Sequence, residues 1–151
     1  MPNSKRLPRK KRVTGIGGIF FKSKDPQALK EWYRVHLGII CLPHGSALFE
    51  WREIEPPGRT GQTVWAPFPI DTGYFNPSHS SFMINYRVAD LSRLLKQLRS
   101  DGVLVDDKVE ECEYGKFGWI MDPEGNRIEL WEPAKANRQV RKARKASRDK
   151  K

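Results

Sequence analysis

The chain has 151 residues, enough for one domain with a sizeable hydrophobic core, and a formal net charge of +10. Its two cysteines, Cys41 and Cys112, lie far apart and outside any paired-cysteine motif, which argues against a disulfide framework and favours a cytoplasmic protein. No apolar run approaches the ~18 residues of a membrane span, and no signal-peptide core follows the basic N-terminus.

The positive charge belongs to the two ends of the sequence. Residues 1–12 hold six Lys or Arg and no acid, and residues 134–151 hold nine Lys or Arg and one acid. Such runs predict disordered tails, the second able to become helical against a polyanion. Residues 13–133 carry a net charge of −4. The tails therefore predict weak, non-specific polyanion contact, and the acidic body opposes a specific nucleic-acid interface.

The first half of the body starts with an apolar strand near Gly18–Lys22 and continues into an amphipathic helix. Asp25 has the side chain of a helix N-cap, and Gly38 suits the left-handed position that ends a helix. Three strand candidates follow the helix. These are Ile39–Leu42, Ala47–Trp51 and Gln62–Ala66.

The second half repeats this order after a connection, residues 67–80, that is rich in Pro, Gly and Ser. A strand near Met83–Val88 leads to Asp90, a second N-cap, and to a helix that stops at Gly102. Its three strand candidates are Val103–Val105, Val109–Met121 with a break at Tyr114-Gly115, and Asn126–Trp131. Each half thus predicts a βαβββ module, at about residues 13–67 and 80–133.

The last strand follows the turn Asp122-Pro-Glu-Gly-Asn126, in which proline presets φ and glycine accepts a positive φ. The turn, the strand Arg127-Ile-Glu-Leu-Trp131 and the repeated module resemble the vicinal oxygen chelate superfamily, which includes glyoxalase I, bleomycin-resistance proteins and extradiol dioxygenases. The resemblance covers residues 13–133. It implies an α+β fold in which tandem βαβββ modules form a curled mixed sheet around a concave cleft, commonly in a homodimer.

Strand alternation predicts which side chains face this cleft, because the helix-packing face should be apolar. In the last strand Ile128 and Leu130 would pack on the helix and Arg127, Glu129 and Trp131 would face the ligand. The same reasoning assigns Val64 and Ala66 to the helix and Trp65 to the cleft. The predicted ligand-binding residues are Phe20, Lys22, Trp65, Met83, Asn85, Arg87, Arg127 and Trp131.

The resemblance also implies where metal ligands would stand, one on the first and one on the last strand of each module. Counting back from each capping aspartate gives Gly18 and Met83, and aligning the closing strands pairs Trp65 with Glu129. Glu129 alone has a side chain for a hard or borderline metal, whereas a catalytic zinc or non-haem iron site needs about three protein ligands. We therefore expect no metal cofactor, and His36, His44 and His79 supply no ligand pair.

Two roles for Glu129 are open. It is a candidate general base in a dry pocket, with a raised pKa, or a carboxylate paired with Arg127 or Arg87 that holds the sheet together. Trp65 and Met83 are likewise either a wall for the ligand or plugs that fill the former metal site. Glu50–Glu55 is expected near the rim of the pocket, and Tyr114–Gly118 in a hairpin beside it.

Two functions remain open. The first is a small-molecule binder of the bleomycin-resistance type, which would hold an aromatic or anionic ligand in an aromatic-lined cleft without metal. The second is an enzyme of the superfamily, a lyase, isomerase or dioxygenase relative, which would use Glu129 with a non-standard metal site. The sequence leaves the identity of the ligand open.

Overall fold

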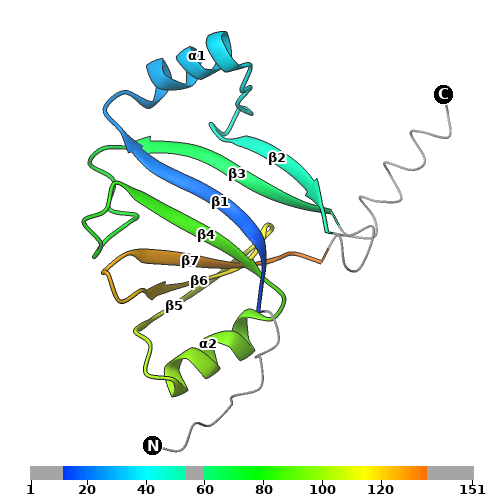
Figure 1. Ribbon diagram of the computed structural model, residues 1–151, viewed down its shortest axis with the longest axis vertical. Coiled ribbons are helices and arrows are strands. Elements are labelled where there is room, and N and C mark those ends of the chain that lie inside the picture. The colour runs from blue at the N-terminus through cyan, green and yellow to red at the C-terminus, as the bar shows by residue number, and fades with distance from the viewer. Residues whose placement is uncertain (1–11, 54–59, 136–151) are drawn as a thin grey trace, which may run out of the picture.

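The computed structural model describes residues 12–53 and 60–135. Within them lie seven strands and two helices (Figure 1). In chain order they are β1 (Val13–Ser23), α1 (Pro26–Leu37), β2 (Ala47–Arg52), β3 (Thr60–Pro69), β4 (Phe82–Val88), α2 (Leu91–Ser100), β5 (Val105–Cys112), β6 (Gly115–Met121) and β7 (Arg127–Pro133). The predicted basic tails fall almost wholly outside the described residues.

All seven strands belong to one mixed sheet in the order β2-β3-β1-β4-β7-β6-β5. Within each half the first strand pairs in parallel with the last, β1 with β3 and β4 with β7. The two halves join where β1 and β4 run antiparallel at the middle of the sheet. The α+β class and the paired-module arrangement are therefore as predicted, in an open sheet whose edges are β2 and β5.

Two strand predictions need correction. The strand predicted at Val103–Val105 begins only at Val105 and runs on to Cys112 as β5, so Val103 and Leu104 lie before it. The other predicted strand is absent. Residues Ile39–Leu42 form no strand and instead lead into a tight turn. The Leu42 amide donates to the carbonyl of Ser46, and the Gly45 amide donates back to the carbonyl of Leu42. These bonds take up backbone groups that a sheet ladder would need. The first half is therefore βαββ, and the second half keeps the full βαβββ order.

Both helices begin where the sequence predicts. The Asp25 carboxylate accepts a hydrogen bond from the Ala28 amide, and the Asp90 carboxylate accepts one from the Arg93 amide. Each bond satisfies an amide that has no partner within the helix. At the other end of α1, Gly38 adopts φ 67°, a left-handed conformation that costs glycine little.

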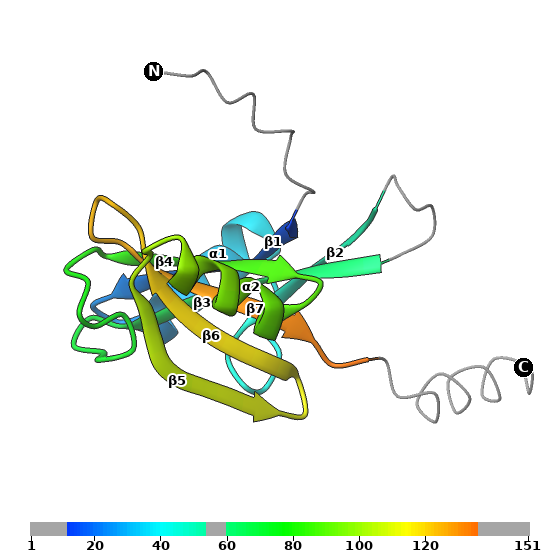
Figure 2. The ribbon, with the colours of Figure 1, turned by 90° about the horizontal axis from the view of Figure 1, so that it is seen from below.

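The two helices differ in how they pack. Helix α2 buries Leu91, Leu94 and Leu95 against Val88 and Leu130, which makes the main aliphatic core. Figures 1 and 2 show α2 lying across the strands of the second half. Helix α1 buries no residue, and Trp32, which has the helical spacing of a core residue, is 52% exposed. Neither helix, among the residues described, is long and apolar enough to cross a membrane.

Candidate functional site

The register of the strands decides which side chains share a face of the sheet. One row runs from β3 to β7 through directly paired residues, Trp65, Ile19, Ile84 and Ile128. The Trp65 ring contacts Tyr33 of α1, and Ile128 packs against the α2 core, so this row lies on the helix-covered face. The neighbouring row, Val64, Gly18, Asn85 and Glu129, therefore lies on the opposite side, which we call the helix-free face.

This register corrects the prediction for β3. Trp65 does not face the cleft: its ring lies between Phe21 and Tyr33 on the helix-covered face. Val64 and Ala66, predicted to pack on the helix, instead contact the aromatic cluster of the helix-free face. The prediction failed because β3 is apolar on both faces, and alternation fixes only the relative phase of a strand.

The register also changes which residue of β3 stands at one of the family's metal-ligand positions. Phe20 lies as far before Asp25 as Asn85 lies before Asp90, and Phe20 pairs with Ala66 as Asn85 pairs with Glu129. The counterpart of Glu129 in the first half is thus Ala66. Trp65 therefore does not fill the former metal site, because Ala66 stands at that position.

The centre of the helix-free face is filled by the protein's own aromatic side chains. The connection between β3 and β4 inserts Phe75, which is 0% exposed, against Phe20, Met83 and Trp119. The Phe75 ring lies 5.3 Å from that of Phe68. Phe20, Met83 and Asn85, all predicted to contact ligand, are therefore buried beneath this segment.

Glu129 lies in this filled centre and is 2% exposed. Its carboxylate accepts hydrogen bonds from Asn85 Nδ2 at 2.7 Å, from Trp119 Nε1 at 2.9 Å, and from the Tyr74 hydroxyl. Burial raises the pKa of Glu129 above its ordinary value, and these donors limit the rise. Neither Arg127 nor Arg87 forms an ion pair with it, so the predicted pairing is wrong.

Tyr74 closes this centre toward solvent. It is 37% exposed as a residue, yet its hydroxyl reaches the buried Glu129 carboxylate. Burial, followed by the charge of Glu129, raises the pKa of the Tyr74 hydroxyl strongly. The hydroxyl therefore stays protonated at neutral pH and remains a donor.

The residues at the family's metal positions do not fit a divalent cation. Gly18, Ala66 and Met83 offer no oxygen or nitrogen ligand, and each oxygen of Glu129 already faces a donor. In the part of the chain that the structure describes, no group of three His, Cys, Asp or Glu is placed to hold a metal. A cation at Glu129 would also meet the hydrogens of three donors.

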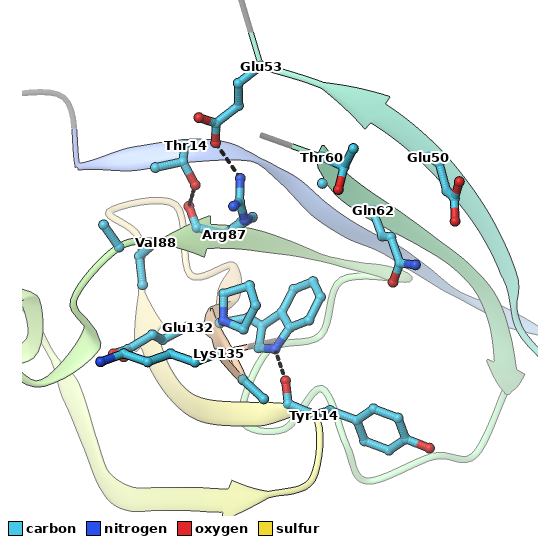
Figure 3. Close-up of a pocket in the computed structure, with 15 residues that line it drawn as sticks. Thr14, Glu50, Glu53, Thr60, Gln62, Arg87, Val88, Tyr114, Glu132 and Lys135 are labelled. Atoms are coloured by element: carbon cyan, nitrogen blue, oxygen red, sulfur yellow. Dashed lines mark hydrogen bonds and ion pairs between the residues drawn. The ribbon is translucent and has the colours of Figure 1, made fainter. Parts of the chain in front are cut away.

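The same face is open at the end where β4 and β7 finish. A cavity of about 760 Å³ lies there (Figure 3). It is lined by Thr14, Glu50, Glu53, Thr60, Gly61, Gln62, Arg87, Val88, Ala89, Tyr114, Trp131, Glu132, Pro133, Ala134 and Lys135. We call it the Arg87 pocket. Its volume is in the range of sites for small organic ligands.

Two of the predicted ligand-binding residues, Arg87 and Trp131, line this pocket. They are direct neighbours on β4 and β7. The Arg87 guanidinium lies 5.4 Å from the centre of the Trp51 ring, and its Nη1 is 2.5 Å from Glu53 Oε1. Trp131 donates through Nε1 to the Tyr114 carbonyl oxygen at 2.8 Å.

The other predicted residues lie elsewhere. Lys22 stands 5.6 Å over the Phe75 ring, outside the Arg87 pocket. Arg127 donates to the Asn76 carbonyl at 2.7 Å and to Asp106 at 3.2 Å, and it lines a separate cavity of about 180 Å³. The predicted single cleft is therefore two regions, one filled and one open.

Sequence reasoning missed Tyr74 and Phe75, which no periodic pattern in the connection indicated. It placed Glu50–Glu55 near a pocket rim, and Glu50 and Glu53 do line the Arg87 pocket. It also predicted the hairpin at Tyr114, which joins β5 to β6 and brings Tyr114 into the pocket wall. The role of Trp51 beside Arg87 depended on contacts between strands that are distant in sequence.

Known structures share this fold. Methylmalonyl-CoA epimerase from Mycobacterium tuberculosis superposes with a TM-score of 0.55 at 23% identity, over 86% of this chain and 95% of that chain. A variant of the Streptomyces coelicolor methylmalonyl-CoA epimerase, in complex with 2-nitronate-propionyl-CoA, gives 0.57 at 20% identity, over 82% and 99%. A 2,3-dioxygenase from Pseudomonas sp. KL28 gives 0.52 at 17% identity, over 81% and 41%. These similarities concern the fold.

No curated protein sequence matches the chain significantly. A family model does match, over residues 15–130, which include every described strand and both helices in whole or in part. The chain belongs to the Glyoxalase/Bleomycin resistance protein/Dioxygenase superfamily.

Proposed function

We propose that this protein binds a small aromatic or anionic organic ligand in the Arg87 pocket and does so without a metal. One observation carries the proposal: the helix-free face has a cavity of about 760 Å³ at Arg87 and Trp131, whereas Glu129 and the metal positions beside it lie under Phe75 and Tyr74. The ligand region has shifted along the face, away from Glu129.

The lining of the pocket supports a planar organic ligand. Trp131 offers an indole whose Nε1 is already bonded to Tyr114 and whose ring is stacked on Phe117, with 7° between the two planes. A side chain held in this way loses little entropy when a ligand packs against it. Gln62 and Arg87 add polar groups around the indole, a mixture typical of small-molecule sites.

Binding of naphthalene-2-carboxamide, a neutral planar probe, tests the proposal. Titration calorimetry should detect binding to the full chain, and Trp131→Ala should weaken it about tenfold or more, since it removes the aromatic floor. Glu129→Gln is the matched control, because Glu129 lies outside the pocket, and it should leave the affinity unchanged. Binding that depends on Glu129 and not on Trp131 would contradict the proposal.

The enzyme alternative keeps one supporting observation, the buried carboxylate of Glu129 with its raised pKa. It requires Tyr74 to leave the carboxylate before a substrate reaches it. Turnover of any substrate that is abolished by Glu129→Gln, and by no pocket variant, would favour this alternative over the binder.

We further propose that the protein is a cytoplasmic homodimer. Trp32, Val35 and Leu37 of α1 are more than half exposed, which supports an interface on this helix, and Cys41 and Cys112 are free thiols. Sedimentation equilibrium should show a dimer that Val35→Glu converts to a monomer. Weak polyanion contact through residues 1–12 and 134–151 stays a proposal drawn from their charge.

A further inference from the structure

The Arg87 guanidinium, in the wall of the Arg87 pocket, already forms an ion pair within the protein. Arg87 Nη1 is paired with Glu53 Oε1 at 2.5 Å, and the two side chains are only 16% and 12% exposed. Figure 3 shows Glu53, which follows β2, and Arg87, on β4, pointing toward one another. The electrostatic attraction within such a shielded pair is strong, because little water screens the two charges.

The Arg87 guanidinium also has N–H donors that the bond to Glu53 does not use. Of its five N–H groups, only Nη1–H has an acceptor among the residues that the structure describes. The plane of the group is positioned by Trp51, whose ring centre is 5.4 Å away, and the side chain lines the cavity. A guanidinium held in this way is suited to receive a carboxylate with two parallel hydrogen bonds.

An aromatic surface lies beside it. Trp131 is the direct neighbour of Arg87 across the β4–β7 ladder. Its ring can occupy this place because residue 17 is glycine: a Cβ there would lie 2.9 Å from Trp131 Cε3 and would overlap Asn85 Oδ1. The fixed indole and the guanidinium therefore present a flat apolar surface and an anion-binding group side by side.

Glu53 differs from the other carboxylates in the pocket wall. Glu132 accepts the Leu91 amide at the start of α2, at 2.8 Å, and Glu50 has no hydrogen bond or ion pair within the described part of the chain. Only Glu53 lies where the acidic group of a ligand would meet Arg87. Its carboxylate has the same charge and geometry as that group.

We propose that Glu53 is an internal competitor for Arg87, and that the ligand is an aromatic carboxylate that displaces it and packs on Trp131. This inference rests on the proposed function and narrows it to one ligand class. The competition sets the affinity: a ligand carboxylate at the unused N–H groups of Arg87 is repelled by the neighbouring Glu53 carboxylate, and a contact that includes Nη1 requires the Arg87–Glu53 pair to break. The wild-type protein therefore discriminates poorly between an aromatic acid and its neutral amide.

The test compares naphthalene-2-carboxylate with naphthalene-2-carboxamide, two probes that differ in one charge. In wild type we expect similar affinities. Glu53→Gln should raise the affinity for the carboxylate, relative to that for the carboxamide, by about tenfold to a hundredfold. A change of this size corresponds to the free energy of one charge-assisted hydrogen bond. Glutamine keeps the shape and an acceptor for Nη1, and Glu53→Ala is a second variant should the first be poorly folded.

Glu50→Gln is the matched control, because it removes the same charge from the same pocket without freeing Arg87. It should change the ratio far less than Glu53→Gln does. Adding Arg87→Gln to Glu53→Gln should remove the gain. An unchanged ratio in Glu53→Gln and Glu53→Ala, or an equal shift in Glu50→Gln, overturns the inference. If the neutral carboxamide fails to bind every variant, the proposed function itself is wrong.

Discussion

The centre of the helix-free face and its open end are made from neighbouring residues of the same strands, yet they differ in what fills them. At the centre, Glu129 is covered by Tyr74 and Phe75 from the β3–β4 connection. Two residues further along β7, Trp131 borders a cavity of about 760 Å³. A single inserted segment thus separates a buried, hydrogen-bonded carboxylate from an open cavity on the same face.

The two regions also differ in how their polar groups are paired. At the centre, the Glu129 carboxylate accepts hydrogen bonds from three donors, whereas the buried Oδ1 of Asn85 has no partner among the residues described. At the open end, Arg87 is held by Glu53 and Trp51, and within residues 12–53 and 60–135 its remaining N–H groups have no acceptor. Substitutions at the centre should therefore change stability, and substitutions at the open end should change binding.

The largest effect is expected for Phe75→Ala. Removing a fully buried ring leaves a cavity among Phe68, Met83 and Trp119 and should lower the free energy of unfolding by about 3–5 kcal/mol. Tyr114→Ala is the matched control at the open end, since the Tyr114 side chain is largely exposed and its backbone carbonyl makes the bond to Trp131. Chemical denaturation measures both. Equal losses would erase the distinction between the regions.

Glu129→Ala should follow, with a loss of about 3 kcal/mol, because Asn85, Trp119 and Tyr74 lose their buried acceptor. Glu129→Gln should lose less, since it preserves shape and one acceptor. The same denaturation series gives both values. A Glu129→Ala variant as stable as wild type would mean that the carboxylate is retained for chemistry and not for the fold.

Gly17→Ala tests the boundary between the regions. The new methyl group would press on Asn85 from one side and on Trp131 from the other, at a cost of about 1–3 kcal/mol and with weaker probe binding. Gly73→Ala is the control, because its Cβ would meet only the Asn76 amide, at 3.5 Å. Calorimetric titration of each variant measures the affinity. Unaltered binding in Gly17→Ala would show that the position of Trp131 does not matter.

The smallest effect is expected in the pH dependence of stability. Because burial raises the pKa of Glu129, the folded state holds this proton more tightly than the unfolded state does. The associated stability is fully present below the ordinary pKa of the carboxyl group and is lost as pH rises through the raised value. Wild type should therefore lose stability, relative to Glu129→Gln, as the pH rises above the ordinary glutamate pKa of about 4.3. Parallel curves of stability against pH for the two proteins would indicate that the pKa of Glu129 is the same in the folded and unfolded states.

Much of this arrangement was set by the sequence alone. Asp25 and Asp90 fixed the starts of both helices through local capping bonds, and the Asp122–Asn126 turn fixed the start of β7. Alternation placed Asn85 and Glu129 on the helix-free face because, in β4 and β7, one face is aliphatic and the other polar. Such signals are local, so neighbouring residues suffice to carry them.

The tertiary structure decided the rest. The face of β3 depended on its parallel register with β1, since both sides of β3 are apolar and either phase suits a buried strand. The positions of Tyr74 and Phe75 depended on how the connection packs against side chains of β1, β4 and β6, which no pattern in the connection records. The Arg87–Glu53 pair joins residues 34 positions apart. Contacts of this kind depend on how separate elements meet in space, and that packing determined where the pocket lies.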